Sequence, residues 1–233
     1  MPLKRLTHSC LGAIALLVLM LTILPSAKAQ SAVQGRIYYF GQSALGENDK
    51  LSLGAGWHST PADHWNRFEL RSTYFYTANN WLKLAYGQRS NFAFSHGDFT
   101  NYEFRPFQSA YLYHPGLTDS QLTHRFMVEQ RAFFNNDLNN QFSARLRYRF
   151  ELNKPIGSIN SFYVRPMSEL FYTIDRDQVN SFSQWKSTLA IGYSMIDYLK
   201  VEFRYEYVLN KVIDEVADLS NRNGFRLQFI HSF

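Results

Sequence analysis

The segment from Phe142 to Leu152 reads FSARLRYRFEL, and its side chains alternate between two chemical types. Every even-numbered position is apolar or aromatic, whereas the odd-numbered positions are Ser143, Arg145, Arg147, Arg149 and Glu151. Successive side chains of a β-strand point to opposite faces, so the segment predicts a strand with one apolar and one charged face. A helix would distribute the arginines around its whole circumference, which excludes the helical interpretation here.

The same alternation recurs on both sides of this segment. It is clear in 66–74, 125–132, 162–172 and 199–207, and weaker in 80–90, 99–110 and 181–193. Polar, turn-like stretches separate these segments. The pattern predicts ten strands, at about 50–59, 66–77, 80–90, 99–110, 121–134, 141–152, 160–174, 181–194, 198–208 and 222–233.

Strands with one apolar and one charged face fit an antiparallel transmembrane β-barrel, which has lipid outside and a polar lumen inside. We therefore expect an all-β protein with a barrel domain over 49–233, preceded by a lead segment over 30–48. The connections 60–65, 90–98, 135–140, 175–180 and 209–221 are assigned to the external side. Gly35 to Phe40 could form a further strand, but an odd total would misplace the N-terminus, so twelve strands is the alternative.

The first 29 residues predict a secretory signal peptide. Lys4 and Arg5 precede an apolar run from Leu11 to Leu24, and Ala27-Lys28-Ala29 provides a small-x-small cleavage site. We expect export through the general secretory route to the outer membrane of a Gram-negative-type cell. Cleavage would remove Cys10, the only cysteine, so we expect no disulfide or cysteine chemistry in the mature chain.

The C-terminal residues alternate as well and end on phenylalanine. This pattern looks like the signal that barrel-assembly machinery recognises in outer-membrane proteins, although His231 is polar where an apolar residue is usual. The expected partners are that machinery during biogenesis and outer-membrane lipid afterwards. The signal residues are Phe225, Leu227, Phe229 and Phe233.

The charged residues of the predicted strands sort to the inner face. Each arginine or lysine on the lipid face at the bilayer midplane costs roughly 2–4 kcal/mol, so a one-residue shift of strand register is strongly disfavoured. We expect an interior network of ion pairs that leaves no wide pore. Its members are Arg67, Glu69, Arg71, Glu103, Arg105, Glu129, Arg131, Arg145, Arg147, Arg149, Glu151, Arg165, Glu169, Arg204 and Glu206.

Several classes of site have no support in the sequence. No run rich in lysine and arginine marks a nucleic-acid partner. No glycine-rich phosphate loop, paired-histidine spacing or calcium-loop pattern is present, so we assign no cofactor and no metal.

Three functional classes remain open. The first is a structural barrel or a narrow channel with a charge-filled lumen. The second is a surface-binding protein acting through external loops, chiefly 90–98 and 209–221. The third is a barrel hydrolase or acyltransferase, because His58 and His64 flank Ser59, Thr60 and Asp63, and His96 lies near Ser95 and Asp98. That spacing is not diagnostic. The other histidines, His114, His124 and His231, form no catalytic pattern either, so we assign no catalytic residue.

The mature chain resembles the domain-of-unknown-function 2490 family. The resemblance rests on Gly35–Phe40 (GRIYYF), His124–Phe133 (HRFMVEQRAF), Arg145–Arg149 (RLRYR), Glu169-Leu170-Phe171 and Gly192-Tyr193. Gln184-Trp185-Lys186 stands where the family leads us to expect an Asn-Arg pair. The resemblance implies an outer-membrane barrel and implies no established activity.

Overall fold

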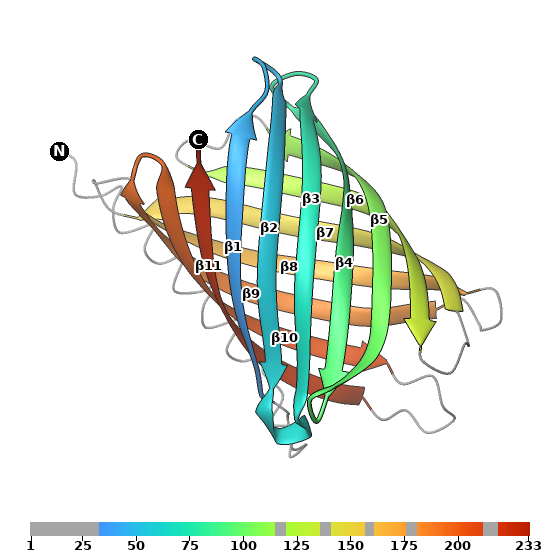
Figure 1. The fold of residues 1–233 in the computed structure, drawn as a ribbon. Coiled ribbons are helices and arrows are strands. Elements are labelled where there is room, and N and C mark those ends of the chain that lie inside the picture. Colours follow the sequence, from blue (N-terminus) through green and yellow to red (C-terminus); the bar gives the residue numbers. More distant parts are fainter. Residues whose placement is uncertain (1–32, 115–119, 136–140, 157–160, 176–180, 212–218) are drawn as a thin grey trace. The chain divides into compact units, whose positions relative to one another are not determined.

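The computed structural model describes residues 33–114, 120–135, 141–156, 161–175, 181–211 and 219–233. Within these ranges the chain forms a closed barrel of eleven strands and one short 3-10 helix, η1 (Pro61–Asp63) (Figure 1). No helix in these ranges is long and apolar enough to cross a membrane. The strands are β1 (Val33–Ala44), β2 (Asp49–Thr60), β3 (Trp65–Thr77), β4 (Leu82–Ser95), β5 (Asp98–His114), β6 (Gln121–Asn135), β7 (Gln141–Ile156), β8 (Phe162–Asp175), β9 (Ser181–Ile196), β10 (Leu199–Lys211) and β11 (Leu219–Ser232).

Neighbouring strands from β1 to β11 pair antiparallel in chain order, and the barrel closes where β1 pairs with β11. This closing pair is parallel, and it runs in register from Val33 opposite Asn223 to Gln42 opposite Ser232. Figure 1 shows the two strands side by side with their arrows pointing the same way. Closure pairs the backbone groups of both terminal strands, so the barrel has no free sheet edge.

The predicted all-β barrel is confirmed, whereas the predicted strand count is wrong. Each of the ten predicted strands corresponds to one strand from β2 to β11. The eleventh is β1, which lies inside the segment 30–48 that was predicted to be a lead. Both the expected ten strands and the alternative of twelve are therefore incorrect, and the predicted signal peptide lies outside the described residues.

Gly35–Phe40 was considered as a further strand and set aside because an odd total would misplace the N-terminus, but the parallel pairing of β1 with β11 closes the barrel with an odd number. The inner face of β1 also differs from those of the other strands. Tyr38 and Phe40 point inward and are buried, so β1 does not alternate between polar and apolar residues. Opposite them on β2 stand Gly56 and Gly54, where a Cβ atom would collide with the two aromatic rings. The missing side chains on β2 make room for aromatic rings on a mostly polar inner wall.

The connection predicted as an external loop over 90–98 is also corrected. β4 continues to Ser95 and β5 begins at Asp98, so only a tight turn at His96 and Gly97 joins them. Both turn residues have positive φ angles, 53° and 96°, a conformation that glycine adopts at no steric cost. Residues 136–140, 176–180 and 212–218, within the other predicted external loops, lie outside the described ranges.

The two faces of the barrel wall differ in chemistry. On β7, the side chain of Leu146 faces outward and is 41% exposed, whereas neighbouring Arg147 faces inward and is 6% exposed. Most exposed large apolar residues occupy such outward positions on the other strands too, for example Phe126, Leu170 and Phe203. The outer wall is therefore apolar and the inner wall is charged, which is the reverse of a water-soluble barrel.

Cysteine cross-linking tests the parallel seam. Tyr39→Cys combined with Phe229→Cys places two thiols on directly opposed residues of β1 and β11. Adjacent strands lie about 5 Å apart, within the Cα separation that a disulfide requires. We expect oxidation to form this cross-link, read as a mobility shift in unreduced gels, and not to form one in the control with Tyr39→Cys and Phe225→Cys. A cross-link in the control and none in the test pair would contradict the pairing of β1 with β11.

Candidate functional site

The candidate site is the inner wall of the barrel. All fifteen charged residues predicted to point inward lie on the inner faces of β3, β5, β6, β7, β8 and β10. Most of them form ion pairs with one another, but Arg67 and Arg71 form none with a described carboxylate. Arg67 instead donates to the Nδ1 atom of His58, 2.9 Å away.

The strongest acceptor on this wall is Glu169 on β8, whose side chain is 1% exposed. Its carboxylate receives Arg125 at 2.5 Å, Arg147 at 2.7 Å and Arg149 at 2.9 Å, and Lys186 lies 3.8 Å away. A buried carboxylate is costly unless it is paired and hydrogen-bonded, and these four cations meet that requirement.

A second acceptor, Glu129 on β6, continues the network toward β5. It receives Arg145 at 2.5 Å and Arg147 at 2.8 Å, so Arg147 bridges Glu129 and Glu169. Arg105 lies 3.9 Å from Glu129 and pairs more closely with Glu103, which also receives Arg131 at 2.8 Å. Ion pairs therefore connect β5, β6, β7 and β8 without a break.

The network continues in the other direction to the seam. Lys186 on β9 lies 3.8 Å from both Glu169 and Glu206. Glu206 on β10 also pairs with Arg36 on β1 and lies 3.8 Å from Arg226 on β11. The ion pairs thus reach across the parallel closure and hold β1 to the rest of the wall.

Glu202 on β10 forms a further acceptor in the network. It pairs with Arg204, receives Arg165 at 3.1 Å, and accepts a hydrogen bond of 2.9 Å from the Tyr163 hydroxyl. Arg165 also lies 3.6 Å from Glu151. These contacts bring β10 and β8 into the same network as β7.

Sequence reasoning left several of these charges out. Arg125 and Glu202 alternate visibly with apolar neighbours, so the signal was present, whereas Arg36 and Arg89 lie in segments whose alternation is interrupted. Lys186 stood at the place where the sequence departs from the family pattern, and the structure puts it between two glutamates. The residues that were missed are Arg36, Arg89, Arg125, Lys186, Glu202 and Arg226.

The two signs of charge lie at different depths on this wall. In the pair of Arg149 with Glu169, the arginine side chain is 17% exposed and the glutamate 1%. The pair of Arg36 with Glu206 shows the same difference. In these pairs the short carboxylate lies against the wall and the longer guanidinium group covers it, so the part of the pair that faces a solute is mainly positive.

One end of the interior holds a polar cavity of about 340 Å³. It lies at the rim where β11 ends, and Lys50, Lys200 and Arg165 are among the residues that line it. Tyr163 and Asn153 add polar groups to the same lining. A cationic rim of this kind raises the local concentration of anions.

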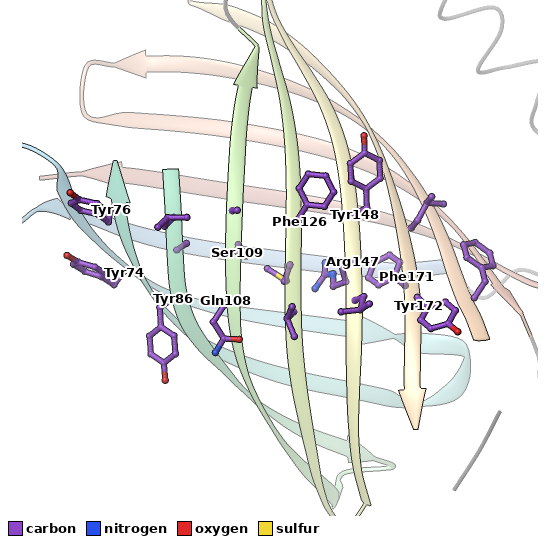
Figure 2. Close-up of a pocket in the computed structure, with 18 residues that line it drawn as sticks. Tyr74, Tyr76, Tyr86, Gln108, Ser109, Phe126, Arg147, Tyr148, Phe171 and Tyr172 are labelled. Carbon is purple, nitrogen blue, oxygen red and sulfur yellow. The ribbon is translucent and has the colours of Figure 1, made fainter. Parts of the chain in front are cut away.

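A larger hollow, of about 1010 Å³, lies on the outer wall over β3 to β9 (Figure 2). Exposed apolar and aromatic side chains line it, among them Tyr86, Phe126, Leu146 and Tyr172. It continues the apolar surface of the barrel, and its lining is predominantly apolar. We therefore place the chemistry of this protein on the inner wall and not in this hollow.

The histidines named as enzyme candidates are not brought together. His58 is buried inside the barrel, where its Nε2 atom meets the Tyr38 hydroxyl and lies 3.6 Å from Glu69. His64 and His96 lie at two neighbouring turns with ring centroids 4.9 Å apart and planes tilted by 33°. None of the hydrogen bonds of the described residues joins a serine hydroxyl to a histidine, so they contain no assembled nucleophile and base.

The remaining candidates also lie apart. His124 and His231 face outward and bond the hydroxyls of Tyr148 and Tyr39, each at 2.8 Å, and His114 is exposed at the end of β5. The described part of the chain holds no group of three or more histidine, cysteine, aspartate or glutamate residues placed to bind a metal ion. Phe225, Leu227 and Phe229, which were predicted to belong to an assembly signal, lie on the outer face of β11, and Phe233 follows it, exposed.

These features define a closed β-barrel with an apolar outer wall and a cation-covered interior. The model of the family described as "Protein of unknown function (DUF2490)" matches residues 26–217, and the chain belongs to this family. The comparison with curated proteins finds no match. Among solved structures, the chain is similar to one described as a NanC porin, with a TM-score of 0.54 and 12% identity over 86% of this chain and 98% of that one.

The stability of the network can be tested at Glu169. We expect Glu169→Gln to lower the free energy of unfolding by about 3 kcal/mol, because it leaves buried guanidinium groups without their charged partner. The control is Glu151→Gln near the rim, whose side chain is 21% exposed and whose loss should cost less than about 1 kcal/mol. Denaturant unfolding of the detergent-refolded protein measures both, and equal effects would show that Glu169 does not organise the network.

Proposed function

We propose that this protein is an outer-membrane β-barrel that forms a narrow, charge-lined channel. The observation that carries the proposal is the inverted wall, apolar outside and charged inside, around a closed barrel. Lipid solvates the outer surface and water enters the polar interior in such an arrangement.

The outer-membrane location draws support from both ends of the chain. The predicted signal peptide over 1–29 would deliver it across the inner membrane, and the aromatic C-terminal strand would present it to barrel-assembly machinery. Outer-membrane lipid would then cover the exposed apolar residues of the wall. The likeness in fold to a protein described as a porin is consistent with this assignment.

The channel is narrow because the interior is occupied by long side chains. A barrel of about this strand number encloses little more space than its inward side chains need. The ion pairs join neighbouring strands along the wall, and several guanidinium groups keep partial exposure, such as those of Arg36 and Arg149. This arrangement supports a restricted aqueous path that ends in the polar cavity at the rim.

The two other functional classes have weaker support. Of the two loops named for a surface-binding role, the segment 90–98 is strand and tight turn, whereas residues 212–218 of the other lie outside the described ranges. A hydrolase or acyltransferase of the serine–histidine type needs a base beside a nucleophile, and none of the hydrogen bonds of the described residues joins a histidine to a serine hydroxyl.

Lipid contact can be tested on β7. Leu146→Cys and Tyr148→Cys place thiols on the apolar face, and Arg145→Cys and Arg149→Cys place them on the charged face. With a fluorophore attached, we expect quenching by brominated lipid only at 146 and 148, and quenching by aqueous iodide mainly at 145 and 149. The opposite pattern, or a protein that stays dissolved without detergent, would contradict a membrane-spanning barrel.

Channel activity can be tested with the purified mature chain in planar bilayers. We expect stepwise currents of small amplitude, well below those of a wide porin, because side chains occupy the lumen. Insertion without any current steps would contradict the channel, and large stable steps would contradict the narrow lumen.

A further inference from the structure

Three arginines lie side by side on the inner faces of β3, β4 and β5. Arg71 is directly opposite Arg89, and Arg89 is directly opposite Arg105. Arg71 is the central residue of β3, and Arg89 is close to the middle of β4. We call these three residues the arginine row, and it lies about half-way along the interior.

Two members of the row have no acidic partner among the described residues. Arg105 pairs with Glu103, whereas neither Arg71 nor Arg89 forms an ion pair with any carboxylate in the described ranges. The Nε atom of Arg89 is buried without a hydrogen-bond partner there. Arg71 has only a hydrogen bond of 3.2 Å from its Nε atom to the Thr73 hydroxyl.

The nearby carboxylates are already engaged. Glu69 accepts a hydrogen bond from Tyr38 and lies 3.6 Å from His58. Glu103 receives Arg105 and Arg131, and Glu129 receives Arg145 and Arg147. Glu69 and Glu129 act on Arg89 electrostatically without coming within ion-pair distance. Arg71 and Arg89 therefore have room for water or a bound anion as a direct partner.

One aromatic ring lies beneath both free guanidinium groups. Their Cζ atoms lie 5.2 Å (Arg71) and 5.6 Å (Arg89) from the centroid of the Phe107 ring. Phe107 is fully buried and fills the space over Gly87. The ring attracts each cation and limits its movement, so both guanidinium groups are anchored to the same aromatic side chain.

Like charges directly opposite each other on neighbouring strands are destabilising. An anion between Arg71 and Arg89 would remove this repulsion. Guanidinium groups match the oxygens of carboxylates and phosphates with paired hydrogen bonds. Both side chains are partly accessible from the interior, and the cationic rim lined by Lys50 and Lys200 would attract anions toward them.

We propose that Arg71 and Arg89 form an anion-binding site inside the barrel, which takes the phosphate or carboxylate group of a small solute and makes the channel anion-selective. The anion selectivity rests on the proposed channel function. Anion binding by Arg71 and Arg89 does not depend on whether the barrel conducts ions.

Binding is tested first, by calorimetry of the full mature chain in a non-ionic detergent at constant ionic strength. Inorganic phosphate and acetate are the two probes, and they distinguish phosphate from carboxylate recognition. We expect saturable binding of at least one probe, weakened tenfold or more in Arg71→Gln/Arg89→Gln. Arg71→Lys/Arg89→Lys keeps the charge but loses the paired hydrogen bonds, so its affinity should lie between those of the unmodified protein and the glutamine double variant.

The matched control is Lys154→Gln, which removes a positive charge from the outer face of β7. It should bind both probes as the unmodified protein does. Neither arginine forms an ion pair, so the glutamine variants should fold, and their unfolding transitions in denaturant check this. The site is overturned if the unmodified protein binds neither probe, or if the glutamine double variant binds them with unchanged affinity.

Selectivity is tested by the reversal potential in a tenfold gradient of potassium chloride across a planar bilayer. We expect chloride to permeate several-fold better than potassium, and this ratio to fall in Arg71→Gln/Arg89→Gln but not in Lys154→Gln. A cation-selective current, or a chloride-to-potassium permeability ratio that is unchanged in the double variant, overturns the proposed anion selectivity but not the proposed channel. The absence of any current overturns the channel, and the calorimetry then decides the binding site separately.

Discussion

The structure depends on buried carboxylates that several cations share. Glu169, Glu129, Glu202 and Glu206 are almost inaccessible to solvent, and each meets at least two arginine or lysine side chains. Removing an acid from water is costly, and only several partners together offset that cost. Because the partners come from different strands, every shared carboxylate also fixes the position of one strand relative to the next.

The same constraint determines what the interior offers to a solute. In the pairs of Glu206 with Arg36 and of Glu169 with Arg149, the short carboxylate lies close to the wall and the longer guanidinium group extends over it. The acids are concentrated on β5 to β10, and β3 contributes only Glu69, which is engaged with Tyr38 and His58. The inner wall is therefore balanced over most of its circumference and positive near β3 and β4, where the arginine row begins.

The sequence predicted the parts of the fold in which alternation is regular. The segment from Phe142 to Leu152 identified its strand and the direction of its charges, and the same holds for β3, β6, β8 and β10. It failed for β1, which was set aside because an odd number of strands was not expected, and alternation cannot show that the first and last strands pair parallel. The fit of Tyr38 and Phe40 over glycines of β2 also leaves no mark in either strand alone. The sequence could not predict that Arg71 and Arg89 have no ion-pair partner among the described residues. That property depends on which strands lie opposite each other and on which arginines each glutamate pairs with.

The parallel pairing of β1 with β11 has a consequence for how the chain is arranged across a membrane. The first residue of β1 and the last residue of β11 emerge at opposite rims. In a barrel that spans the bilayer, a reporter fused before Val33 and one fused after Phe233 would be delivered to different compartments.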